Sequence, residues 1–186
     1  MAAPDHMKRP SRGAAIAGAV VMLGCAAGTL AVLRGCQQEV TSTNQNINVA
    51  PVTIGGQKFM LEIAADNASR ELGLGQRQSI EPRGGMIFVF PLPGVRGFVM
   101  RDCPIPIDIA YVDDAGRILG MYAMQPEEPR REGESREAYE SRLKVYSSRF
   151  PCRFVIEVAG GTLAKLGVQP GDVVTFDAEA LKKRAL

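Results

Sequence analysis

Residues 52–63 read Val-Thr-Ile-Gly-Gly-Gln-Lys-Phe-Met-Leu-Glu-Ile, and this stretch is the strongest local indication of the fold. Phe59, Leu61 and Ile63 alternate along it, as residues on the buried face of a β-strand do. The pair Gly55-Gly56 separates two strand-like runs and suits the positive φ angles of a tight hairpin turn. The stretch therefore predicts a β-hairpin at the start of a folded domain.

Further strand-like runs follow the hairpin at short intervals. Asp66 or Asn67 can cap a short helix that ends near Gly73, and another helical turn ends near Gly167. The remaining strand-like runs occupy residues 86–90, 95–100, 107–112, 117–124, 154–158 and 173–176. We therefore expect a mainly β (α+β) domain at residues 51–180, built as one small barrel-like or strongly curved antiparallel sheet with two or three short helices.

Residues 126–150 interrupt the strand pattern with a charged segment. Ser135 suits the N-cap position of a helix, and Tyr139, Leu143 and Tyr146 recur after it at helical spacing. The spacing predicts an amphipathic helix inside a charged insertion.

The N-terminal part is apolar rather than strand-like. Residues 13–33 are 21 residues without a charge, a length that can span a hydrocarbon core of about 30 Å as a helix. Lys8, Arg9 and Arg12 precede this run, which by the positive-inside tendency keeps residues 1–12 in the cytoplasm. We expect the domain to lie on the exported side of a membrane, periplasmic or extracellular.

Two forms of the tether stay open for residues 13–36. Leu33-Arg34-Gly35-Cys36 is similar to a bacterial lipoprotein box, in which Cys36 would be lipidated after cleavage, although Arg34 departs from that pattern. Alternatively, the segment is an uncleaved transmembrane anchor. The polar composition of residues 37–50 predicts a flexible linker in either case.

Several motifs of the domain resemble the domain of unknown function 192 (DUF192) family. They are Gly73-Leu74 with Arg77, residues 85–91, residues 98–102, residues 105–109, and the closing residues 154–158 with Gly161 and Gly171-Asp172. The resemblance runs from about residue 52 to residue 176 and implies a compact, mainly β single domain without an established activity. Val99 stands where that family usually has Trp, and residues 75–76 and 101–103 also depart from its pattern.

Composition excludes several classes of function. His6, the single histidine, precedes the apolar run, so the exported domain lacks the base of Ser-His-Asp or Cys-His catalysis and a histidine metal ligand. Cys103 and Cys152 are too few for a cysteine zinc site, and no phosphate loop or dinucleotide fingerprint occurs, so we expect no metal or cofactor. The two thiols could instead form a disulfide in an oxidising compartment.

The charge balance does not favour nucleic acid as a partner. The first 36 residues hold four of the 22 basic and one of the 20 acidic residues, which leaves 18 basic and 19 acidic residues in the rest. A nucleic-acid-binding domain would show a basic excess there.

Charged residues gather between Phe98 and Asp108, and we expect any functional surface to centre there. The candidate binding residues are Arg77, Met100, Arg101, Asp102 and Asp108. Arg101 would hold an anionic or carbonyl group while the two aspartates orient it. The alternative is an Arg-Asp network that only fixes a loop.

Each candidate also has a structural interpretation. Asp102 and Asp108 could act as general acid and base, but Asp108 at a strand entrance more often accepts backbone N–H bonds. Arg77 suits a salt bridge, and Met100 suits a core position. Glu157, in Val-Ile-Glu-Val, is expected on the solvent side of its strand.

Two functions remain open from the sequence. The first is a non-catalytic cell-envelope binding or accessory module with an unknown envelope ligand or protein as partner, and the second is a carboxylate-dependent hydrolase of envelope glycans or peptides. A cavity with two carboxylates about 5 to 10 Å apart would favour the hydrolase, and an apolar groove would favour binding.

The uncharged run predicts that the protein fractionates with membranes. Detergent should release it and high salt should not, because ions do not screen apolar insertion. Cys36→Ser should abolish lipid labelling of a lipoprotein and leave a helical anchor unaffected. Recovery of the full chain in the soluble fraction would contradict the tether.

Overall fold

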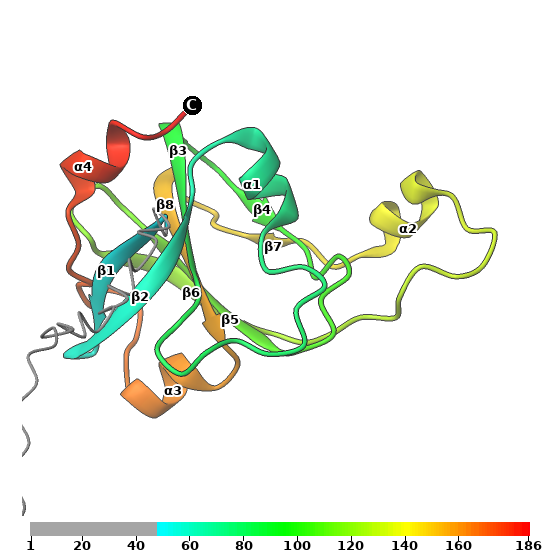
Figure 1. Ribbon diagram of the computed structural model, residues 1–186, viewed down its shortest axis with the longest axis horizontal. Helices are drawn as coiled ribbons and strands as arrows, with labels where there is room; N and C mark the ends of the chain where they lie inside the picture. Colours follow the sequence, from blue (N-terminus) through cyan, green and yellow to red (C-terminus); the bar gives the residue numbers. More distant parts are fainter. Residues whose placement is uncertain (1–47) are drawn as a thin grey trace, which may run out of the picture. The chain divides into compact units, whose positions relative to one another are not determined.

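The computed structural model describes residues 48–186, which form one domain around a six-stranded sheet (Figure 1). The strand order is β1-β2-β3-β8-β5-β6, so the last long strand in the sequence lies in the middle of the sheet. The strands are β1 (Val49–Ile54), β2 (Gln57–Ala64), β3 (Met86–Gly94), β5 (Ile107–Val112), β6 (Ile118–Met124) and β8 (Cys152–Ala159). The mainly β class expected from the sequence is confirmed.

The β1–β2 hairpin forms as its sequence predicts. Its register pairs Val52 with Phe59 and Ile54 with Gln57. Gly55 and Gly56 have φ values of 53° and 76°, the left-handed backbone that a two-residue hairpin turn requires. The alternating apolar residues of β2 are buried, as expected.

The expected antiparallel, barrel-like sheet is corrected in two respects. First, β2 and β3 are parallel, with Glu62 opposite Met86, so the sheet is mixed. Parallel neighbours need a crossover connection, and residues 65–85 supply it with helix α1 (Asn67–Leu72). Second, the sheet is not closed as a barrel.

Residues 172–175 contact both edge strands of the open sheet, β1 and β6. Thr175 exchanges two backbone hydrogen bonds with Thr53 of β1, at 2.8 and 3.0 Å. At the other edge, the Ile118 N–H donates to Asp172 O at 2.8 Å. The strand expected at residues 173–176 is therefore two isolated bridges that cover both sheet edges.

Both faces of the sheet are covered. On one face, helices α3 (Thr162–Leu166) and α4 (Ala178–Lys182) contribute Leu163 and Leu181 to a hydrophobic cluster. A second cluster, which includes Phe88 and Tyr111, lies under α1, the loop after it and the small pair β4 (Gly97–Phe98) and β7 (Tyr146–Ser147). Central strands therefore have no solvent side.

Helix α1 ends where its sequence predicts. The Asp66 carboxylate accepts the Ser69 N–H at 2.9 Å and the Ser69 hydroxyl caps back onto Asp66, forming a capping box. Gly73 ends the helix with φ 53°. Local capping thus fixes the helix beside the start of the crossover.

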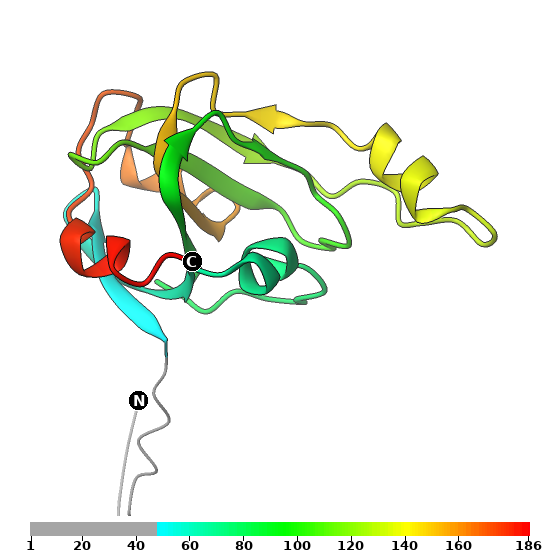
Figure 2. The ribbon, with the colours of Figure 1, turned by 90° about the horizontal axis from the view of Figure 1, so that it is seen from above.

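The charged insertion contains helix α2 (Arg136–Arg142), which extends away from α3 and α4 (Figure 2). Ser135 is its N-cap and accepts the Ala138 N–H at 3.1 Å. Tyr139, Leu143 and Tyr146 are all buried, but the helix ends at Arg142 and Tyr146 belongs to β7. The helical spacing of these three residues therefore predicted their burial, but it did not predict that they lie on different elements.

The expected cytoplasmic segment, membrane segment and most of the linker lie outside the described residues. Val49 and Ala50, assigned above to the linker, belong to β1. Within residues 48–186, no helix is long and apolar enough to cross a membrane.

Gly85→Ala should destabilise the domain far more than Gly133→Ala. Both glycines have positive φ, 142° and 75°, but a Cβ at Gly85 would lie 2.2 Å from the Glu157 carbonyl oxygen, whereas Gly133 has open space. We expect about 1 kcal/mol for Gly133→Ala and at least about 2 kcal/mol more for Gly85→Ala. Urea denaturation measures both, and equal losses would contradict the close approach of β8 to Gly85.

Candidate functional site

Two adjoining hollows lie on the face of the sheet that carries α1. The Glu157 cavity, between α1, β3 and residues 95–103, has a volume of about 500 Å³. The α1–α2 cleft, between α1, residues 101–102 and α2, has a volume of about 710 Å³. Glu71, Leu72, Gly75 and Arg101 line both hollows and so form the boundary between them.

Glu157 is buried on the central strand, which corrects its expected solvent position. Its residue is 5% exposed, and it stands between Met86 of β3 and Ile109 of β5. Because both faces of β8 are covered, the alternating side chains of this strand all point into protein or into the cavity. Glu157 lines the Glu157 cavity.

The carboxyl group of Glu157 is electrostatically unusual. Among the described residues its carboxyl takes part in no ion pair and no hydrogen bond, and its oxygens are not among the side-chain atoms that are fully buried without a partner, so they border the cavity. Burial raises the pKa of Glu157 to about 8, because the low-dielectric surroundings disfavour the charged form. The group is therefore mainly a neutral carboxylic acid at neutral pH.

Aromatic side chains form the apolar wall of the cavity. The Phe88 and Phe98 rings meet edge to face, with centroids 4.9 Å apart, and Phe98 continues to Tyr111 at 6.0 Å. The Tyr111 hydroxyl donates to the Tyr146 carbonyl at 2.5 Å, which ties β5 to β7. The wall is thus fixed by packing from three strands.

Two guanidinium groups lie at the third aromatic side chain of the cavity, Phe90. Arg96 stacks over this ring at 4.0 Å, and Arg70 lies at 5.2 Å from its centroid. Arg96 donates to the Leu92 carbonyl at 2.6 Å but has no carboxylate partner among residues 48–186, and its Nε is buried without a hydrogen bond. Arg70 donates to the carbonyls of Ala65 and Val89, both at 2.7 Å.

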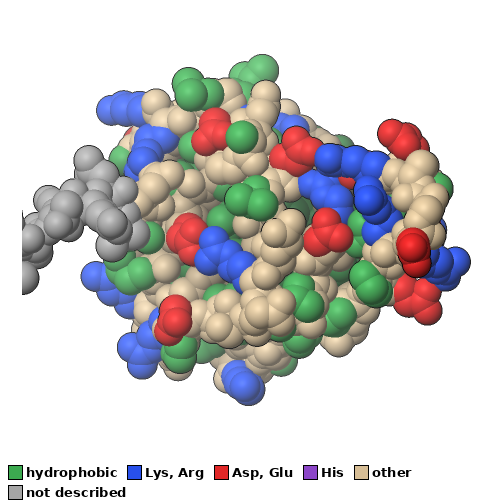
Figure 3. All heavy atoms as spheres, turned by 45° about the vertical axis from the view of Figure 1, so that its right-hand side comes forward, with side chains coloured by type: hydrophobic (Ala, Val, Ile, Leu, Met, Phe, Trp, Pro, Cys, Tyr) green, Lys and Arg blue, Asp and Glu red, His purple; other side chains and the backbone are tan. Residues whose placement is uncertain are grey.

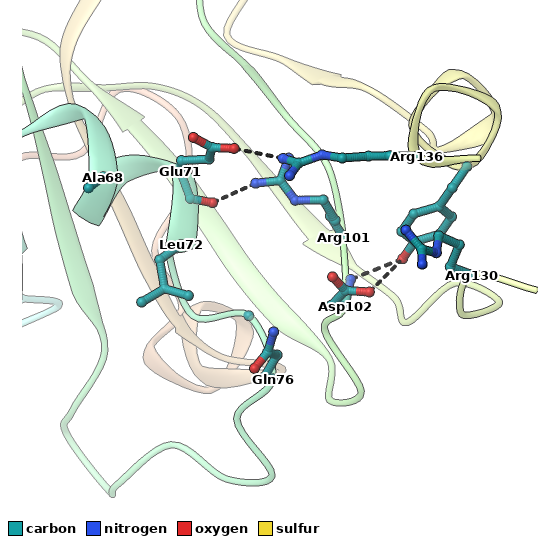
Figure 4. A pocket seen from close by; sticks show the side chains of 10 residues that line it. Ala68, Glu71, Leu72, Gln76, Arg101, Asp102, Arg130 and Arg136 are labelled. Carbon is teal, nitrogen blue, oxygen red and sulfur yellow. Dashed lines mark hydrogen bonds and ion pairs between the residues drawn. The ribbon is translucent and has the colours of Figure 1, made fainter. Parts of the chain in front are cut away.

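Arg101 stands at the boundary of the hollows and is held from two sides (Figure 4). Its guanidinium donates to the Glu71 carbonyl of α1 at 2.6 Å and to Glu140 of α2 at 2.9 Å. Arg136 of α2 pairs with the Glu71 carboxylate at 2.7 Å. These contacts join α1, the loop after β4 and the insertion.

On the α2 side of the molecule, a group of basic side chains lies next to acidic side chains (Figure 3). Arg142, for example, pairs with Glu134 at 2.8 Å and lowers the pKa of that carboxyl to about 2. The insertion therefore carries charges of both signs, and several of them are in ion pairs.

Asp102 lies at the α1–α2 cleft in a left-handed backbone conformation, with φ 55°. Its N–H donates to the Tyr139 hydroxyl at 3.0 Å, and that hydroxyl contacts the Asp102 carboxylate at 3.4 Å (Figure 4). Asp102 is thus positioned mainly by the insertion.

The other candidate residues lie outside both hollows. Met100 is 1% exposed in the core. Arg77 forms a bidentate salt bridge with the Glu62 carboxylate, with N–O distances of 2.5 and 2.8 Å. Asp108 faces the opposite side of the sheet and accepts the Leu163 N–H at 2.8 Å. For these three, the geometry matches the structural interpretation given above.

A family model matches the domain that carries both hollows. The DUF192 model, described as "Uncharacterized ACR", matches residues 50–176. The chain belongs to the DUF192 family. No curated protein matches the chain.

Two solved structures are similar to this DUF192 chain. A Sinorhizobium meliloti 1021 protein, described as a "putative transcription regulator", is 27% identical with a TM-score of 0.56, covering 70% of this chain and 92% of its own. A protein of unknown function from Novosphingobium aromaticivorans DSM 12444 is 28% identical with a TM-score of 0.56, covering 68% and 83% respectively.

The two cysteines of the DUF192 domain are free thiols in the structure. Cys103 lines the cavity, where burial and the Glu157 carboxyl raise its thiol pKa to about 11, so it is not a reactive thiolate at neutral pH. Cys152 begins β8, five residues or about 16 Å of strand from Glu157. The possible disulfide between Cys103 and Cys152 is not formed in the structure.

Sequence reasoning missed Glu157 and Arg96 as site residues. Glu157 interrupts an apolar run that a doubly covered central strand would make continuous, and that interruption was the available signal. Arg96 follows a turn-like segment and carries no comparable sequence signal.

Glu157→Gln should change the pH dependence of stability. The folded pKa of about 8 exceeds the unfolded value near 4.5, so on raising the pH the unfolded state loses this proton first and favours unfolding. Wild-type stability should fall by up to about 1.4 kcal/mol per pH unit between these values relative to the variant. Urea titrations at pH 5 and pH 8 measure the difference, and parallel profiles would contradict a buried neutral Glu157.

Proposed function

We propose that this DUF192 chain is a ligand-binding module of the cell envelope, held at the membrane by its N-terminal segment. The uncharged run at residues 13–33 and its basic flank support the tether. The binding role rests on one observation: the buried Glu157 carboxyl lines a cavity and has no protein partner among the described residues.

Burial of a carboxyl without a partner costs free energy that the fold alone does not recover. A ligand that hydrogen-bonds Glu157 would supply the missing partner. The cavity volume of about 500 Å³ falls in the range of small-molecule sites, and Phe88 and Phe98 offer an apolar surface. Recognition would therefore combine ring packing with one buried polar contact.

Geometry favours binding over the alternative, a carboxylate-dependent hydrolase of glycans or peptides. Such a hydrolase needs a second free carboxylate near the first. Glu71 is the other carboxylate that lines the Glu157 cavity, and it is paired with Arg136. The high thiol pKa of Cys103 likewise does not favour nucleophilic chemistry.

We do not extend the regulator description of the Sinorhizobium meliloti protein to this chain. A regulator that binds DNA would need a basic surface. Residues 126–150 hold six basic and six acidic residues, and some of them form pairs, as in Arg142–Glu134 and Arg136–Glu140.

The proposal predicts that phenol binds in the Glu157 cavity. Its ring would pack on Phe88 and Phe98 and its hydroxyl would contact Glu157, with a Kd on the order of 1 mM. Saturation-transfer NMR on the detergent-solubilised full chain measures binding, with protein-free micelles as the blank. Val99→Trp, which fills the cavity, should weaken binding at least about fivefold.

Val173→Trp is the matched control. Val173 is exposed, pairs with Arg117 at the edge of the sheet and does not line the cavity. It should bind phenol as wild type does. Equal binding by wild type and Val99→Trp would exclude this cavity as the ligand site.

A further inference from the structure

The charges around the Glu157 cavity are unequal, and this bears on the chemistry of its ligand. Arg70, Arg96 and Arg101 line it, against the carboxyl groups of Glu71 and Glu157. Glu71 is already paired with Arg136, an arginine outside the cavity. Arg101 is paired in turn with Glu140, and Arg70 donates to an oxygen of Leu186, so the uncompensated cation of the lining is Arg96.

The cations and the buried carboxyl are carried by different elements. Glu157 belongs to the central strand β8, which is covered on both faces. Arg96 and Arg101 belong to the segments before and after β4, and both side chains are partly exposed. A ligand that enters from solvent would meet the guanidinium groups first and the Glu157 carboxyl last.

Arg96 is the guanidinium group with the least protein compensation. It contacts one backbone carbonyl and the face of Phe90, and it has no carboxylate partner among the described residues. Its backbone is held by Ser148, whose hydroxyl accepts the Arg96 N–H at 2.9 Å. A fixed backbone with an uncompensated charge is a favourable arrangement for an incoming anion.

We infer that the ligand is a small organic acid with an apolar body, whose anionic group binds Arg96 and Arg101 and whose uncharged polar end hydrogen-bonds Glu157. This inference rests on the proposed function and adds the ligand's chemical class. The Glu157 carboxyl, neutral at pH 7, can both donate to and accept from a hydroxyl or carbonyl group. The apolar body packs between Phe88, Phe98 and Leu74.

Three compounds that share a phenol ring test the charge at the other end. They are 3-(4-hydroxyphenyl)propionate, its uncharged amide, and the cation 4-(2-aminoethyl)phenol. Calorimetric titration into the solubilised full chain at pH 7, with protein-free micelles as the blank, gives each affinity. We expect the propionate to bind about tenfold or more tightly than the amide, and the cation to bind most weakly.

Arg96→Met tests the residue assignment, because it keeps an apolar stem and removes the charge. It should reduce the propionate affinity to that of the amide and leave the amide affinity unchanged. Arg101→Met is a second variant with the same expectation, which matters if one variant loses stability in urea denaturation. Arg83→Met is the matched control, since Arg83 is exposed and lines neither hollow.

The outcomes separate this inference from the proposed function. Suppose that Val99→Trp weakens the binding of phenol and of the amide, but that the propionate binds no more tightly than the amide. The cavity is then a ligand site, and the anionic class is wrong. Preference for the cation likewise overturns the anionic class. If none of the compounds, phenol included, binds the wild-type chain, both the inference and the proposed function are overturned.

Discussion

The structure depends on strand β8, which is hydrogen-bonded between β3 and β5 and covered on both faces. Its apolar residues Phe154, Val155, Ile156 and Val158 are fully buried and join the two hydrophobic clusters. A strand in this position has no solvent-facing row of side chains. Any polar residue on it must find a partner within the protein or in a bound ligand.

The parallel pairing of β2 with β3 explains why a cavity forms beside this strand. Parallel neighbours cannot be joined by a hairpin, so residues 65–85 cross over the face of the sheet before they reach β3. Helix α1 and the loop after it therefore stand over the sheet as one wall of the Glu157 cavity. The segment around β4 supplies the facing wall, and Arg101 links the two through the Glu71 carbonyl.

Local chemistry made much of the fold predictable from the sequence. Gly55-Gly56 predicted the hairpin, Asp66 and Gly73 the ends of α1, and Ser135 the start of α2, because each effect involves residues within a few positions. Strand pairing depends on distant residues, so neither the parallel β2–β3 pair nor the open sheet followed from strand-like runs.

The candidate site was only partly predictable for the same reason. The density of charge at residues 98–108 pointed to Arg101 and Asp102, which do line the hollows. The alternation of side chains along a strand could place Glu157 on the other face of the sheet from its neighbours Ile156 and Val158. It could not show that a crossover helix covers that face of the sheet. The functional meaning of Glu157 depends on that non-local covering.

Asp108 and Glu157 show how burial differs from function in this domain. They are carried by the neighbouring strands β5 and β8, and both are almost fully buried, at 3% and 5% exposure. Asp108 accepts the Leu163 N–H with one oxygen and so fixes α3, while its other oxygen, Oδ1, is buried without a hydrogen-bond partner. Glu157 faces the other side of the sheet, where the protein offers a cavity in place of a donor. Neither carboxyl is fully compensated by the fold, and the difference between them is that Glu157 borders a cavity, which is why the proposed ligand contact concerns Glu157 alone.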